Sequence, residues 1–177
     1  MTRIVSLDPG LATFGLVAIE TNGIEHRCRG VDVFTSEPHA RQLNSAMADD
    51  RVRRTRELQR WLASWLDHVQ PSAIAAESMS FPRGAHAIVS ISLGWGVLCS
   101  ELERRQLPLV CAFPTHWRKS LTRSGREEDS HIEAVRRVPS FAAIAGAIPH
   151  ALQAHALDAL GVFCWGVTTD TVRAVLR

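Results

Sequence analysis

Residues 3–20, RIVSLDPGLATFGLVAIE, decide the fold of this 177-residue chain. The apolar run from Ile4 to Leu7 is typical of a buried strand, and Asp8-Pro9-Gly10 forms a turn after it. A second strand-like run fills the rest of this stretch, so the two runs are predicted to form a hairpin. Asn22-Gly23 predicts another hairpin turn, which leads into a strand within residues 24–34. Three antiparallel strands therefore open the sheet.

The rest of the chain alternates helices with strands. A long helix is expected to start at an N-cap, Asp49 or Asp50, and to end at Pro71. Thr115 is expected to cap a short helix that carries Trp117. The other predicted elements are strands at 72–76 and 107–113 and helices at 85–105, 127–137 and 150–166. Because helical crossovers join the later strands, those strands are parallel. The predicted fold class is α/β, with a mixed five-stranded sheet flanked by helices.

The composition is that of an ordinary folded domain, with 46% apolar and 21% charged residues. A strand begins at once, so we expect no signal peptide. The longest apolar stretch, residues 88–99, contains serines and glycines and is expected to be too short to cross a bilayer. No Cys-x-x-Cys pair is present, and Cys99, Cys111 and Cys164 lie in apolar runs. They are expected to be small buried residues of a cytoplasmic protein with no membrane partner.

The kind of basic residue says more than the net charge of +2, because Lys119 is the only lysine among 20 basic residues. The planar guanidinium of arginine suits phosphate oxygens, although a GC-rich coding bias explains the same excess. One cluster, residues 51–60, lies beside acids and fits a solvated helix face. The other contains Arg118, Lys119, Arg123 and Arg126 around a Gly/Ser loop. This second cluster is the better candidate for phosphate contacts.

Three acids stand in apolar segments far apart in the sequence: Asp8, Glu77 and Asp158. Each has a structural interpretation by itself, since Asp8 suits a turn and Glu77 can cap the segment after it. Asp158 has no cationic neighbour four residues away, so an ion pair within its helix does not explain it. Desolvating a carboxylate costs several kcal/mol, and hard divalent cations neutralise gathered carboxylates well. Together the acids predict a metal-dependent phosphodiesterase.

The motifs come in a characteristic order: Asp-Pro-Gly-x4-Gly at residues 8–15, a strand-terminal Glu77, and His-x-x-Asp-Ala-Leu at residues 155–160. This order resembles the RuvC family of Holliday junction resolvases, whose fold is ribonuclease H-like. The resemblance covers nearly the whole chain. It implies a single nuclease domain over residues 1–167, followed by a short tail at residues 168–177, which packs on the domain or stays loose.

The resemblance implies that Asp8, Glu77, His155 and Asp158 are catalytic metal ligands that hold two Mg²⁺ or Mn²⁺ ions. Such ions would bridge a scissile phosphate, one activating water and the other stabilising the leaving 3′-oxygen. His155 stands where some members have an acid, and its imidazole tilts the preference toward Mn²⁺. His155 and Asp158 share one helix face because they are three residues apart. By itself, His155 also fits a partly buried histidine with a hydrogen-bonded ring.

The resemblance further implies contacts to branched DNA and a homodimer. Phe81 resembles the aromatic residue that the family places near the junction core, with a core side chain as an equal alternative. Phe81, Arg83 and the four cations of the second cluster are the predicted DNA-binding residues. The helix at 85–105 is apolar on more than one face, which fits a dimer interface or a helix covered by its own domain. A branch-migration helicase is left open as a partner.

The leading prediction is an endonuclease that resolves four-way DNA junctions by paired symmetric nicks. The same chemistry on flaps, forks or structured RNA is one alternative, and a non-catalytic junction-binding module is another. An actin-like sugar kinase or ATPase needs a second domain, for which 177 residues leave no room. Glu127-Glu128-Asp129 stands where family members often carry a lysine and would repel phosphate. Arg118, Lys119 or Arg126 can substitute for that lysine.

Overall fold

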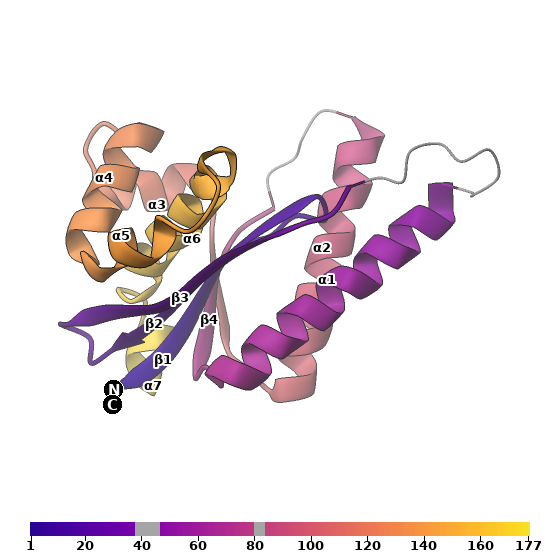
Figure 1. Ribbon diagram of the computed structural model, residues 1–177. Coiled ribbons are helices and arrows are strands. Elements are labelled where there is room, and N and C mark those ends of the chain that lie inside the picture. Colours follow the sequence, from indigo (N-terminus) through magenta and orange to yellow (C-terminus); the bar gives the residue numbers. More distant parts are fainter. Residues whose placement is uncertain (38–46, 80–83) are drawn as a thin grey trace.

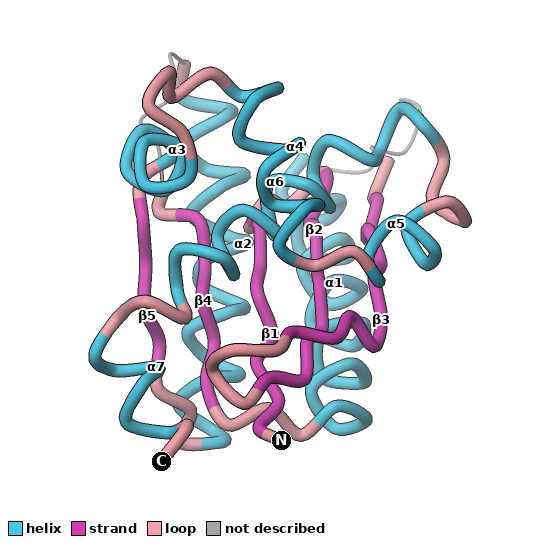
Figure 2. The backbone as a smooth tube through the Cα atoms, turned by 90° about the vertical axis from the view of Figure 1, so that its left-hand side faces the viewer, coloured by secondary structure: helices cyan, strands magenta, loops and turns pink. Residues whose placement is uncertain are grey.

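A computed structural model describes residues 1–37, 47–79 and 84–177 of the chain. It contains a five-stranded sheet in the order β3-β2-β1-β4-β5 (Figures 1 and 2). The strands are β1 (Thr2–Asp8), β2 (Thr13–Thr21), β3 (His26–Thr35), β4 (Ala73–Glu77) and β5 (Leu109–Ala112). The pairs β1–β2 and β2–β3 are antiparallel, while β1–β4 and β4–β5 are parallel. The predicted mixed sheet is therefore confirmed.

Helices cover both faces of the sheet, as Figure 1 shows. One face packs on α1 (Met47–Val69) and α2 (Ala85–Arg105). The elements of the other face are α3 (Pro114–Leu121), α4 (Glu127–Arg137), α5 (Ser140–Ala145), the 3₁₀ turn η1 (His150–Leu152), α6 (Gln153–Gly166) and α7 (Asp170–Val175). The predicted helices at 85–105 and 127–137 have the bounds of α2 and α4.

The alternation of side chains along β1 divides the core into two layers. Val5 and Leu7 are fully buried against α1 and α2, together with Leu62. Ile4 is buried on the opposite face with Trp117 and other side chains of α3 to α7. Because successive residues of a strand point to opposite faces, Asp8 projects to the same side as Ile4. The end of β1 thus directs a carboxylate toward α6.

Two predicted helix caps are wrong. The helix α1 begins at Met47, so Asp49 and Asp50 lie inside its first turn. The N-cap of α3 is Phe113, followed by Pro114, and Thr115 lies within the helix. Proline is well suited to the first helical position because its φ angle is already helical and it needs no N–H partner there. The proline therefore decides where α3 starts.

The helix α2 has its predicted bounds, Ala85–Arg105. It is long and apolar enough to cross a membrane by length and composition alone, a test that core helices also pass. One side packs on the sheet through Val97 and Leu98, and Glu101 is buried in a pair with Arg104. Cys99, on the same helix, is exposed. That test applies to the whole of α2, so the expectation for residues 88–99 stays a prediction.

The thiols were only partly predicted. All four cysteines are free, and Cys28 and Cys164 are buried, whereas Cys99 and Cys111 are exposed. Cys111 lies on β5, an edge strand whose alternate side chains are buried or exposed in turn. Its neighbours Val110 and Ala112 are buried on the opposite face, in the core with α3 to α7.

The end of the chain packs on the domain. Val172 of α7 is fully buried in the core that faces α6. The segment after residue 167 is therefore helical and packed, and the boundary placed there remains a prediction.

Candidate active site

Asp8 and Glu77 end two neighbouring parallel strands. Leu7 of β1 pairs with Ala76 of β4, so the next residue of each strand, an acid in both cases, lies at the carboxyl edge of the sheet beside the other. Both acids lie on the α6 face, because Ile4 and Ala75 of the same strands pack there. Backbone pairing alone therefore places these two carboxylates together.

The start of α6 closes over the same edge. Gly15 of β2 pairs with Asp8, and a Cβ atom at Gly15 would collide with the carbonyl oxygen of His155. Glycine at this position thus lets the first turn of α6 rest directly on the sheet. The result is a hydrogen bond of 2.6 Å between His155 Nδ1 and Asp8 Oδ2. The second glycine of the Asp-Pro-Gly-x4-Gly motif therefore has a steric role in the site.

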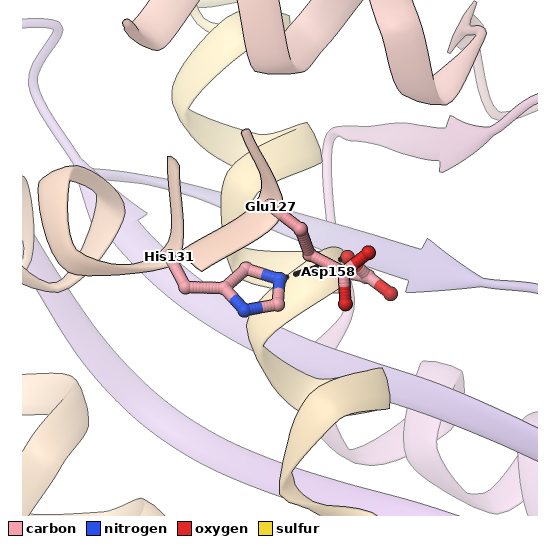
Figure 3. Close-up of side chains that lie close together, drawn as sticks. All are labelled: Glu127, His131 and Asp158. Atoms are coloured by element: carbon pink, nitrogen blue, oxygen red, sulfur yellow. Dashed lines mark hydrogen bonds and ion pairs between the residues drawn. The ribbon is translucent and has the colours of Figure 1, made fainter. Parts of the chain in front are cut away.

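Asp158 lies one turn further along α6 and has partners from α3 and α4. His131 Nε2 lies 2.9 Å from Asp158 Oδ1, and Arg118 Nη2 lies 3.4 Å from the same oxygen. The same guanidinium nitrogen pairs with Glu127 Oε2 at 2.8 Å. Figure 3 shows Glu127, His131 and Asp158 converging. Asp158 does have a cationic neighbour, but it comes from another helix.

Glu77 is held by an indole. Trp117 Nε1 donates a hydrogen bond of 2.8 Å to Glu77 Oε2. The Trp117 side chain is fully buried, and a Cβ atom at Gly161 of α6 would overlap its ring. Close packing of α3 on α6 thus aims the indole N–H at the carboxylate.

The electrostatics of the site show a shortage of positive charge. Burial, and then the nearby Asp8 carboxylate, raise the pKa of Glu77 to about 7. Burial likewise raises the pKa of Asp8, with a smaller contribution from Asp158, while the hydrogen bond to His155 acts in the opposite direction. That hydrogen bond raises the pKa of His155. The three carboxylates therefore repel one another, which a bound cation would relieve.

The donors suit a hard or borderline divalent cation, because they are carboxylate oxygens and an imidazole nitrogen. Electrostatic interactions connect four of these residues, because the charge of each affects the pKa of at least one other: Asp8, Glu77, His155 and Asp158. A second group of donors shares Asp158: the ligand atoms of Glu127, His131 and Asp158 lie within 4.8 Å of one another.

The sequence prediction missed Trp117, Glu127 and His131 as parts of the site. Glu127 and His131 carried a usable signal, since residues four apart share a helix face. Trp117 carried none, because a tryptophan in a short helix is most often a core residue. Their contacts to the predicted acids depend on how α3 and α4 pack.

The predicted DNA-binding residues fall into three groups. Phe81 and Arg83 lie outside the described residues. Arg118 turns toward Asp158 and Glu127. The remaining cations, Lys119 on α3 and Arg123 and Arg126 in the loop after it, are exposed to solvent. Their role in DNA binding stays a prediction.

Two arginines of α1 form ion pairs and hydrogen bonds within the protein, in contrast to the exposed cations after α3. Arg53 pairs with Asp50 and Glu57, each at 2.8 Å. Arg54 is buried and donates to Ser36 Oγ at 2.9 Å. These contacts support the interpretation of this cluster as a structural, partly solvated face.

A mixed five-stranded sheet between two helical layers, with acids at the ends of β1 and β4, defines a ribonuclease H-like protein with an acidic site. A model of the family described as crossover junction endodeoxyribonuclease RuvC matches residues 4–164. The chain belongs to the RuvC family.

Individual relatives agree with this assignment. The chain is 28% identical over 166 residues to the crossover junction endodeoxyribonuclease RuvC of Corynebacterium diphtheriae, covering 91% of this chain and 93% of the relative. It is 30% identical over 139 residues to that of Synechococcus sp. strain WH7803, covering 76% and 82%. In fold it is similar to T. thermophilus RuvC in complex with Holliday junction substrate, with a TM-score of 0.73, 17% identity, and coverage of 92% and 90%.

Proposed function

We propose that this chain is a metal-dependent endodeoxyribonuclease that resolves four-way DNA junctions by paired symmetric nicks. The observation that carries the proposal is the meeting of Asp8, Glu77 and Asp158 at one edge of the sheet. Membership of the RuvC family supports it, as do relatives named crossover junction endodeoxyribonucleases. The fold is also similar to that of a relative solved with a Holliday junction substrate.

We assign Asp8, Glu77, His155 and Asp158 as the ligands of two Mg²⁺ or Mn²⁺ ions. When bound, such ions would supply an activated water and stabilise the leaving 3′-oxygen. The raised pKa values of Asp8 and Glu77 support this assignment. They show that the buried carboxylates lack enough positive charge nearby, and a bound cation would supply it. His155 binds Asp8 through Nδ1, which leaves its Nε2 as the nitrogen for ligation.

The side chains around these ligands hold them in place. His155 fixes the orientation of Asp8, and the Trp117 indole fixes that of Glu77. Arg118 balances the charge of Asp158 and Glu127. The chain itself thus keeps the carboxylates close together, where a scissile phosphate would bind.

We assign the exposed side chains of Lys119, Arg123 and Arg126 to the DNA backbone. They extend from α3 and from the loop after it, next in sequence to Arg118, which pairs with Asp158 at 3.4 Å. Phe81 and Arg83 are kept as candidate contacts to the junction. A protein with such contacts binds more weakly as salt rises.

We assign the outer face of α2 to a homodimer. Ile88 and Val89 of this helix are 44% and 37% exposed. Neighbouring large apolar side chains that are exposed to this degree fit a surface that a partner covers. Two copies related by a two-fold axis would present two sites for two symmetric cuts. The cytoplasm is the proposed location.

The direct test is incubation of the protein with a synthetic four-way junction, with and without Mn²⁺, and then mapping of the products. Paired symmetric nicks only with Mn²⁺ are expected. Asp8→Asn and Asp158→Asn should abolish cleavage while junction binding survives. Asp170→Asn, at an exposed position at the start of α7, is the matched control and should cut normally. Cleavage at the wild-type rate by either site variant would refute the assignment.

The same assay separates the alternatives. Flaps, forks and structured RNA are offered beside the four-way junction, because they share the phosphodiester chemistry. Equal cleavage of flaps would indicate broader branch specificity, and metal-independent binding without any cleavage would indicate a junction-binding module.

A further inference from the structure

Two aromatic rings outside the predicted ligand set connect the carboxylates of the site. Trp117 donates to Glu77 at 2.8 Å, and His131 Nε2 lies 2.9 Å from Asp158 Oδ1. The two rings stack on each other, with centroids 6.2 Å apart and planes inclined by 16°. One continuous line of contacts therefore runs from Glu77 through both rings to Asp158. We call this pair of rings the aromatic bracket.

The surroundings hold the bracket in place. Trp117 is fully buried, and Gly161 of α6 lies so close that even a methyl group there would overlap the indole. The Arg118 guanidinium carbon lies 5.1 Å from the centre of the Trp117 ring. The indole cannot turn without displacing one of these neighbours, and the imidazole of His131 stacks against the indole. The hydrogen bonds to the two acids therefore have fixed directions.

The contacts of Arg118 bear on whether Glu127, His131 and Asp158 form a metal site of their own. Its Nη2 atom pairs with Glu127 at 2.8 Å and with Asp158 at 3.4 Å. A guanidinium thus already supplies the positive charge beside Glu127, His131 and Asp158. A separate metal site at these three residues is disfavoured, and a supporting role for His131 is favoured.

We propose that Trp117 and His131 are positioning residues, which hold Glu77 and Asp158 in the arrangement that binds the metal. This inference rests on the proposed function, since it takes these two acids as ligands. Groups that hydrogen-bond to metal ligands orient them, and their loss typically lowers metal affinity about 10-fold to 100-fold. The bracket couples two ligands from different elements through one stack, so either ring should influence the whole site.

The test measures Mn²⁺ binding to the full-length protein by calorimetry, independently of cleavage. Trp117→Phe and His131→Phe keep a ring for stacking but remove the polar nitrogen, and each is expected to lower Mn²⁺ affinity about 10-fold to 100-fold. His131→Gln keeps an N–H donor and is expected to retain most of the affinity. His116→Phe, an exposed position on α3, is the matched control and should bind as the wild type does.

Cleavage of a four-way junction provides a second readout. If the rings position ligands, raising the Mn²⁺ concentration should restore much of the rate lost in Trp117→Phe, whereas a general folding defect would not be restored. Thermal unfolding shows whether each variant is folded. Should Trp117→Phe fail to fold, the His131 variants carry the test, because His131 is only partly buried.

The outcomes separate the bracket from the proposed function. Wild-type Mn²⁺ affinity in both phenylalanine variants overturns the bracket, whatever the protein cuts. Absence of Mn²⁺ binding by the wild type also overturns it. If the wild type binds Mn²⁺, the variants bind it weakly, and no junction is cut, the bracket stands and the proposed nuclease falls.

Discussion

Replacing Glu77 with glutamine is expected to remove much of the pH dependence of stability in the metal-free protein. The pKa of Glu77 is raised from 4.5 to about 7, first by burial and then by Asp8. Between these values the unfolded chain gives up the proton while the folded protein keeps it. The free energy of unfolding therefore falls as the pH rises through this window, and the full penalty is present above it.

The size of the effect comes from the shift. One pKa unit corresponds to about 1.4 kcal/mol, and partial solvent exposure of Glu77 lowers the result, so a loss of about 1–3 kcal/mol is expected. Glu77→Gln carries no charge at any of these pH values, and its amide oxygen can still accept the Trp117 N–H. The variant should match the wild type at low pH and exceed its stability above about pH 7.

Urea denaturation in EDTA, between about pH 5 and about pH 8, measures this difference. The pKa values of Asp8 and His155 are also raised, so both residues lower the free energy of unfolding as the pH rises. They do so in the wild type and in Glu77→Gln alike. Glu25→Gln, in the exposed turn between β2 and β3, should behave like the wild type. If wild type and Glu77→Gln lost stability in parallel, Glu77 would not be the buried acid described above. Mn²⁺ should stabilise the wild type most above about pH 7, where the carboxylates are ionised.

Three further changes test the packing and the dimer. Gly161→Ala would press a methyl group into the Trp117 ring and is expected to cost about 1–3 kcal/mol in chemical denaturation, whereas Gly96→Ala meets nothing within 4 Å and should cost nothing. Asp32→Ala removes the acceptor of two indole N–H groups of α1, at 2.8 and 2.9 Å, and should lower the free energy of unfolding by about 2–4 kcal/mol; unchanged stability would contradict this. Ile88→Asp should convert a dimer into a monomer in sedimentation, and an unchanged dimer would place the interface elsewhere.

The elements of the fold were predictable because their boundaries are chemically marked. Asp8-Pro9-Gly10 separates β1 from β2, and Pro71 comes just after the end of α1. Helix α2 occupies the predicted residues 85–105. The cap prediction for α3 failed because Thr115, a polar residue that suits an N-cap, competed with Pro114 at the first position of the helix. The short helix α5 was not predicted, since its six residues carry little periodic pattern.

The acids of the site were predictable from burial, but their partners were not. Asp8 and Glu77 end apolar strands, which marks them in the sequence alone. The donor to Glu77 comes from a residue 40 positions away, and His131 is 27 positions from Asp158. These contacts exist only because α3 and α4 pack on α6. No local pattern encodes that packing.

The pairing of β1 with β4 makes the site sensitive to one kind of genetic change and tolerant of another. Leu7 lies opposite Ala76, so the separation of the acids next to them is set by peptide groups rather than by neighbouring side chains. Exchanging one apolar residue for another beneath Asp8 would leave that separation intact. Deleting a single residue within β4 would instead turn Glu77 to the face of α1 and α2, because adjacent residues point to opposite sides. Over evolutionary divergence, this edge can therefore absorb many point substitutions and no change in strand length.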